Sequence, residues 1–197
     1  MKRTALALAF VFAAALGACD RSTVSSEIEK QDAQAAADAA KAKQANAAFL
    51  AENKAKPGVT TTKSGLQIEV LRAGDKGLPT PGPSDEVTVM YEGKLIDNSV
   101  FDSSYQRGQP VSFEVGGVIP GWTEALQLMH PGEMAQLVLP PEIGYATEAK
   151  PSIPANSVLI FKVELLGFRK SDGTLVPHVA APAAPAASDA PAKPKNN

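Results

Sequence analysis

Cysteine and histidine are almost absent from this chain of 197 residues: Cys19 is the only cysteine, and His130 and His178 are the only histidines. These are too few ligands for an ordinary zinc or iron–sulfur site. His130 lies in a turn-like segment and His178 near the C-terminus, which argues against a Ser/His/Asp arrangement. We therefore expect no metal and no cofactor, and any catalysis has to proceed without a thiolate or an imidazole.

An excess of basic residues is also lacking, because Lys and Arg number 19 against 21 Asp and Glu, for a formal net charge of -2. A nucleic-acid-binding groove would leave a basic stripe in the sequence. No Gly-rich phosphate loop of the Walker or dinucleotide kind is present. The sequence thus indicates no nucleic-acid partner.

Aromatic residues make up only 6% of the chain, but eight of the eleven lie between Ser64 and Lys170. This stretch of about 107 residues is long enough for one hydrophobic core and too short for two. The composition predicts four parts, with these bounds: a signal peptide (1–18), a lipidated cysteine and Ala-rich tether (19–63), one folded domain (64–170), and a disordered Ala/Pro tail (171–197).

The N-terminus has the pattern of an export signal. Lys2 and Arg3 precede an apolar run, Ala5–Ala18, that is shorter than the ~20 residues needed to span a bilayer as a helix. The following Leu16–Cys19 resembles the lipobox of bacterial lipoproteins, in which the cysteine is lipidated; the alternative is an ordinary cleaved signal with an incidental cysteine. We expect a lipid-anchored protein of the bacterial cell envelope that faces the periplasm, and the choice of inner or outer membrane stays open.

The Ala-rich segment predicts a helix from Glu27 to Lys56, with a capping box at Ser26–Glu29 and a stop at Pro57. Its large apolar residues are confined to Ile28, Phe49 and Leu50. A coiled-coil seam needs apolar residues sustained over several heptads. A solvated spacer, and hence a monomer, is favoured over a helix-mediated dimer.

The rest of the aromatic-rich stretch alternates with a period of two, which is typical of half-buried antiparallel strands. The expected strands are Leu66–Val70, Val87–Tyr91, Val111–Val115, Met134–Leu139 and Leu159–Leu165. Only Trp122–Met129 has the spacing of a short amphipathic helix. The predicted fold is α+β: a curved antiparallel sheet of five to six strands wrapped on one short helix and preceded by the Ala-rich helix.

Seven motifs then occur in a recognisable order: Val87–Leu95, Phe101–Ser104, Gly108–Pro110, Val118–Trp122, Gly144–Tyr145, Ile153–Pro154 and Leu159–Leu165. In this order they resemble the FK506-binding-protein (FKBP) family of peptidyl-prolyl isomerases. Ser64–Gln67 is similar to the start of the domain in the exported bacterial branch, which includes the macrophage infectivity potentiators. The resemblance implies an FKBP-like fold and isomerase activity on proline-containing, unfolded or exported polypeptides.

The resemblance also implies an apolar pocket with a set of site residues. The catalytic candidates are Asp102, Tyr145 and Tyr91; the substrate-binding candidates are Phe101, Phe113, Val118, Ile119, Trp122, Ile153 and Phe161. By analogy, the Ile119 N–H and the Tyr145 hydroxyl would bond carbonyls of the bound peptide. Lys150, Ala146 and a shortened loop depart from the family pattern, so substrate preference and macrolide inhibitor binding stay open.

These residue types suit rotation about an X-Pro bond, which is opposed by a barrier of ~18–20 kcal/mol and breaks no covalent bond. A dry aromatic pocket can favour the twisted amide, which has lost the charge separation that water stabilises. Together with the resemblance, this chemistry predicts a peptidyl-prolyl cis-trans isomerase that assists the folding of exported proteins. A non-catalytic holdase chaperone, or an adaptor lipoprotein using the same pocket, is the alternative.

Overall fold

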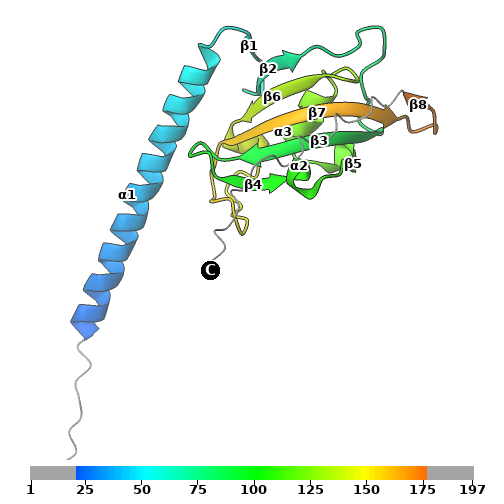
Figure 1. Cartoon of the computed structure of the whole chain (residues 1–197). Helices are drawn as coiled ribbons and strands as arrows, with labels where there is room; N and C mark the ends of the chain where they lie inside the picture. The colour runs from blue at the N-terminus through cyan, green and yellow to red at the C-terminus, as the bar shows by residue number, and fades with distance from the viewer. Residues whose placement is uncertain (1–20, 177–197) are drawn as a thin grey trace, which may run out of the picture. The chain divides into compact units, whose positions relative to one another are not determined.

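The computed structural model describes residues 21–176 (Figure 1). The chain divides into two units, residues 1–40 and 41–197. No helix within the described residues is long and apolar enough to cross a membrane. The predicted signal peptide and the lipidation of Cys19 lie outside the described residues and stay predictions.

Helix α1 runs from Arg21 to Lys54 and contributes to both units. The expected start at Glu27 is wrong, because the helix already passes through Ser26, so Ser26–Glu29 does not cap its first turn. Alanine has the highest helix propensity, which accounts for a continuous helix through the Ala-rich middle. Residues 33–45 are exposed.

The second unit is built on one antiparallel sheet in the order β1-β2-β6-β7-β3-β4, with β5 on β3 and β8 on β7. Its strands are β1 Val59–Thr61, β2 Gln67–Arg72, β3 Glu86–Lys94, β4 Val100–Ser103, β5 Val111–Glu114, β6 Met134–Leu139, β7 Leu159–Arg169 and β8 Leu175–Val176. The α+β fold is confirmed. The expected number of strands was too low, because β1, β4 and β8 are too short to show alternation.

Helix α3, Pro120–Leu126, lies against the sheet (Figure 1). It begins two residues before the predicted start, since Pro120 takes a first-turn position that lacks an intrahelical hydrogen-bond partner in any case. A second short helix, α2 at Ser104–Arg107, was not predicted. The Ser103 side chain caps it by accepting from the Gln106 N–H at 3.2 Å.

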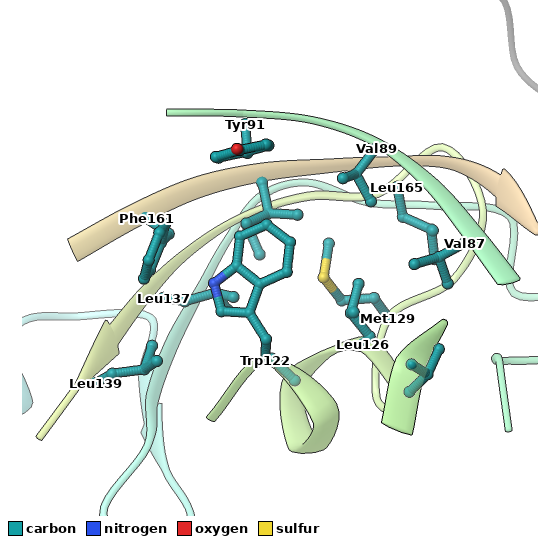
Figure 2. Packing of buried hydrophobic residues seen from close by; sticks show 14 of the residues in the cluster. Val87, Val89, Tyr91, Trp122, Leu126, Met129, Leu137, Leu139, Phe161 and Leu165 are labelled. Atoms are coloured by element: carbon teal, nitrogen blue, oxygen red, sulfur yellow. The ribbon is translucent and has the colours of Figure 1, made fainter. Parts of the chain in front are cut away.

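The main core fills the space between α3 and the strands β3, β6 and β7 (Figure 2). Val87 and Val89 from β3 meet Leu126 from α3, and all three are completely buried. Trp122 and Tyr91 belong to the same cluster, so these two expected site residues are also part of the main core. A pocket built this way inherits the rigidity of close packing.

The opposite face of β7 departs from simple alternation. Glu164, at a position where the period of two places a polar side chain in solvent, is fully buried. Its carboxylate accepts hydrogen bonds from the Arg72 guanidinium and, at 3.2 Å, from the Tyr105 hydroxyl of α2. Burial of this carboxyl group is tolerated because both of its oxygens accept hydrogen bonds.

The folded unit extends past both expected borders of the domain. Strand β1 pairs with β2 before residue 64, and β8 pairs with β7 after residue 170. The expectation of a disordered tail from residue 171 is wrong for its first six residues, because a turn at Gly173 returns the chain and buries Val176. Residues 177–197 lie outside the part that the structure describes.

Candidate active site

A pocket of about 610 Å³ opens beside the core. Its lining includes all ten residues expected from the sequence to form the site: Tyr91, Phe101, Asp102, Phe113, Val118, Ile119, Trp122, Tyr145, Ile153 and Phe161. Gly117, Lys150, Pro151 and Ser152 complete it. A volume of this size holds more than a proline ring and leaves room for its neighbours in a peptide.

Trp122, at the start of α3, packs beside Tyr91 and Phe161 (Figure 2). Its ring packs edge-to-face against three others at centroid distances of 5.2 Å to Tyr91, 5.9 Å to Phe113 and 5.2 Å to Phe161. Phe101 in turn packs edge-to-face on Phe161 at 5.5 Å. This geometry is the one that aromatic quadrupoles prefer, so the rings hold one another in place.

Phe113 illustrates why the site needed a tertiary structure. The family resemblance named it only as a substrate-binding candidate. In the structure it packs against the main core cluster and also lines the pocket. Packing and site are one set of contacts here.

The polar edge of the pocket is a network of three side chains. The Tyr91 hydroxyl donates to one Asp102 oxygen, and the Arg107 guanidinium donates to the other. Arg107 also donates to the Tyr91 oxygen at 3.1 Å. Sequence reasoning missed Arg107; the only signal was a basic residue in the last turn of a helix too short to be predicted.

The network sets the protonation of its members. Burial alone would raise the pKa of Asp102, but hydrogen bonds from Tyr91 and Arg107 outweigh it and hold the pKa below its usual range. Burial, together with the neighbouring carboxylate, raises the pKa of Tyr91. At neutral pH the site therefore presents an ionised carboxylate and a protonated phenol.

The loop after Tyr145 forms another part of the pocket wall. Lys150 and Ile153 exchange backbone hydrogen bonds of 2.9 and 3.1 Å, which closes a tight turn around Pro151. The Lys150 ammonium lies 5.2 Å from the centre of the Tyr145 ring and 2.6 Å from a Glu148 oxygen. A cation over a phenol ring at this distance is a favourable contact.

No histidine or cysteine is among the residues that line this pocket. His130 lies elsewhere, with its Nδ1 2.9 Å from the Leu78 carbonyl oxygen. Among residues 21–176, no group of three or more His, Cys, Asp or Glu is placed to hold a metal ion. The site offers an apolar surface, a fixed carboxylate and hydrogen-bond donors, which suits binding and bond rotation rather than bond cleavage.

Comparison with known proteins matches two family models to this chain. The model described as "FKBP-type peptidyl-prolyl cis-trans isomerase" matches residues 78–166, and that described as "Domain amino terminal to FKBP-type peptidyl-prolyl isomerase" matches residues 14–70. "Peptidyl-prolyl cis-trans isomerase Mip" of Coxiella burnetii is 51% identical over 124 residues, which are 62% of this chain and 53% of that protein.

Two solved structures are also similar. The crystal structure of FkpA from Escherichia coli has 39% sequence identity and a TM-score of 0.67, with 76% of this chain and 70% of that chain covered. A peptidyl-prolyl cis-trans isomerase from Pseudomonas syringae has 36% identity and a TM-score of 0.60, with 65% of this chain and 93% of that chain covered. The chain spans about half the length of the curated relatives it matches. By these matches and by its fold, the chain belongs to the FKBP-type peptidyl-prolyl cis-trans isomerase family, in the branch that includes Mip and FkpA.

Proposed function

We propose that this chain is a peptidyl-prolyl cis-trans isomerase that accelerates X-Pro isomerisation in exported polypeptides. The observation that carries the proposal is the pocket itself: an edge-to-face aromatic cage around Trp122, bordered by the Tyr91–Asp102–Arg107 network. Proline is the residue whose ring is apolar and whose preceding amide populates both the cis and the trans isomer. A pocket that combines a dry floor with fixed polar groups suits that substrate.

Catalysis follows from differences between the planar and the twisted amide. Resonance makes the planar amide charge-separated, so water stabilises it more than it stabilises the twisted form. Transfer of the prolyl ring onto Trp122 would remove that water and lower the barrier. No proton has to move and no covalent bond has to form, in keeping with the groups that line the pocket.

Hydrogen bonds to the peptide would supply the rest. Ile119 is at the N-cap of α3, and no acceptor within the described residues is paired with its N–H. This donor and the Tyr145 hydroxyl could hold carbonyl oxygens on either side of the rotating bond. The Asp102 carboxylate would then face the carbonyl carbon, which becomes more electropositive as nitrogen donation is lost.

The localisation of the protein in the cell is the second part of the proposal. Cys19 would be lipidated and would anchor the chain in the bacterial envelope with the domain facing the periplasm. Mass spectrometry of the membrane fraction tests the lipid, and an unmodified soluble N-terminus would refute it. Sedimentation of the mature chain with Cys19 replaced by Ser tests the expected monomer.

The decisive experiment is a protease-coupled assay on a proline tetrapeptide. We compare the intact chain with Trp122→Leu, Asp102→Asn and, as a matched charge-removing control, Asp172→Asn in the exposed turn before β8. Asp102→Asn should lower kcat/KM about tenfold, since a preorganised charge at the reacting bond is lost, whereas Asp172→Asn should leave it unchanged. An intact chain no faster than the uncatalysed control, but able to suppress aggregation of unfolded protein, would favour a holdase instead.

A further inference from the structure

The last turns of α1 are part of the folded unit rather than a free spacer. Phe49 and Leu50 pack on a small apolar cluster formed by Val138, Val158 and Ile160, separate from the main core. Asn53 is only 2% exposed and donates to the Gln67 amide oxygen at 2.8 Å, while Gln67 donates back to the Leu50 carbonyl at 2.9 Å. The helix end is thus fixed on the strands by both apolar and polar contacts.

One further contact of this helix reaches the loop that lines the pocket. The Asn46 side-chain amide donates to the Asn156 carbonyl oxygen at 2.7 Å. The Asn156 N–H in turn donates to the Ala146 carbonyl oxygen at 2.7 Å, and Ala146 directly follows Tyr145. Two successive hydrogen bonds therefore connect α1 to the wall of the pocket.

The loop is one that needs external support. Ala146 and Asn156, near its two ends, have φ values of 49° and 59°, in the left-handed region, which asparagine tolerates but alanine rarely occupies. Such conformations persist only where the surroundings hold them. Between them the loop has little regular structure besides the Lys150–Ile153 bridge, and yet it contributes Tyr145, Lys150 and Ile153 to the pocket.

We propose that Asn46 is a positioning residue: its hydrogen bond to Asn156 holds the loop of residues 145–156 in the conformation that lines the pocket. Helix α1 is then a working part of the isomerase, and the inference rests on the proposed isomerase function. Loss of the bond would let the loop sample conformations that do not bind peptide. Apparent affinity falls by the fraction of competent molecules, so the effect appears in KM before kcat.

Replacement of Asn46 separates this role from a contribution to stability. Alanine has a higher helix propensity than asparagine, so Asn46→Ala should leave the helix as stable or make it more stable. A variant that is equally stable and yet binds peptide more weakly would not be expected if Asn46 only supported the fold. Asn46→Asp adds a second case, because it keeps the shape, removes the N–H donors and places a carboxylate against the Asn156 carbonyl.

The test uses the full chain, with Gln34→Ala as control. Gln34 is another exposed amide on α1, bonded to Asp38 of the same helix at 3.0 Å and not to the loop. Steady-state rates on a proline tetrapeptide give kcat and KM separately, and hydrogen exchange follows the Asn156 and Lys150 amides. For both Asn46 variants we expect KM to rise about two- to tenfold, the change that one hydrogen bond of ordinary net strength corresponds to. We also expect kcat within about twofold of the intact chain and faster exchange at Asn156, with neither change in the control.

The outcomes distinguish this inference from the proposed function. An active intact chain whose Asn46→Asp variant keeps the same KM would overturn the inference, whether or not loop exchange is faster. An intact chain without isomerase activity would instead refute the proposed function. In that case, unchanged hydrogen exchange at Asn156 in the Asn46 variants would also refute the positioning role of Asn46. Faster exchange at Asn156 would show that Asn46 holds the loop even though the chain is not an isomerase.

Discussion

Replacement of Gly93 by alanine should displace two aromatic rings that line the pocket. Gly93 lies in β3, opposite Phe161 of the neighbouring strand β7. A Cβ atom built at this position would come within 2.6 Å of the Phe101 ring and 2.7 Å of the Phe161 ring. Both rings belong to the aromatic wall, so they cannot move without changing the pocket.

The size of the effect follows from the geometry. Carbon atoms in contact are separated by about 3.5–4.0 Å, so the two rings have to retreat by about 1 Å. Phe161 is already packed on Trp122 with centroids 5.2 Å apart, which leaves it no free volume on that side. Overpacking of this kind costs about 1–3 kcal/mol of stability. A displacement of about 1 Å at reacting groups can lower a rate by up to about 100-fold.

We therefore expect Gly93→Ala to remain folded and to lose at least about tenfold in kcat/KM, because activity is the more sensitive quantity. Urea unfolding gives the stability and the proline tetrapeptide assay gives the activity. Gly82→Ala is the control: its Cβ would meet the nearest Asp85 oxygen at 3.5 Å, an ordinary contact remote from the pocket. Unchanged kcat/KM in Gly93→Ala would refute the argument that this glycine sets the position of the aromatic wall.

Three further predictions concern charge. Arg72→Met should destabilise the fold by about 2–4 kcal/mol, because it leaves the buried Glu164 carboxylate without its charged partner. Combining it with Glu164→Leu should recover most of the loss of stability measured by urea unfolding. Additive losses from the two substitutions would contradict this prediction. The isomerase rate should be flat between pH 5 and 9. The pKa of Asp102 is lowered, so the contribution of its carboxylate is present above pH ~4 and is lost only as the pH falls further. The pKa of Tyr91 is raised, so its hydroxyl proton is lost only above pH ~10. An inflection near pH 6.5 in the pH–rate profile would implicate a histidine and contradict the proposed site. Lys150→Met should reduce the ratio of kcat/KM for a peptide with glutamate before proline to that for a peptide with leucine there, by about two- to fourfold at low salt. The same ratio in Lys150→Met and in the unsubstituted chain would show that this ammonium does not select substrates.

Long strands and the helix under the sheet could be predicted from local pattern. Apolar residues recur at every second position of β3 (Val87, Val89, Tyr91) and of β7 (Phe161, Val163, Leu165), because this face of each strand packs in the main core. Strands of two to four residues and the single-turn helix α2 show no such pattern. They form because tertiary neighbours accept their hydrogen bonds, as β7 does for β8.

The lining of the pocket could be predicted, but not from periodicity. All ten expected residues line one pocket. They could be named in advance because the family motifs identified them jointly. Trp122 taken singly has the features of a core anchor, and Asp102 those of a turn residue. Glu164 shows the limit of alternation, since its burial depends on Arg72 of β2 and Tyr105 of α2, which are distant in sequence.

The sequence by itself determined the order of the long strands and of α3, the concentration of aromatic residues in one segment and the scarcity of cysteine and histidine, because composition and local spacing carry that information. Only the tertiary structure decided that Arg107 completes the Tyr91–Asp102 pair, that Gly93 leaves room for two rings, and that Asn46 reaches Asn156. Asn46 and Asn156 are 110 residues apart. Such contacts depend on strand register and on where a helix packs, and the periodicity of a single element does not contain either.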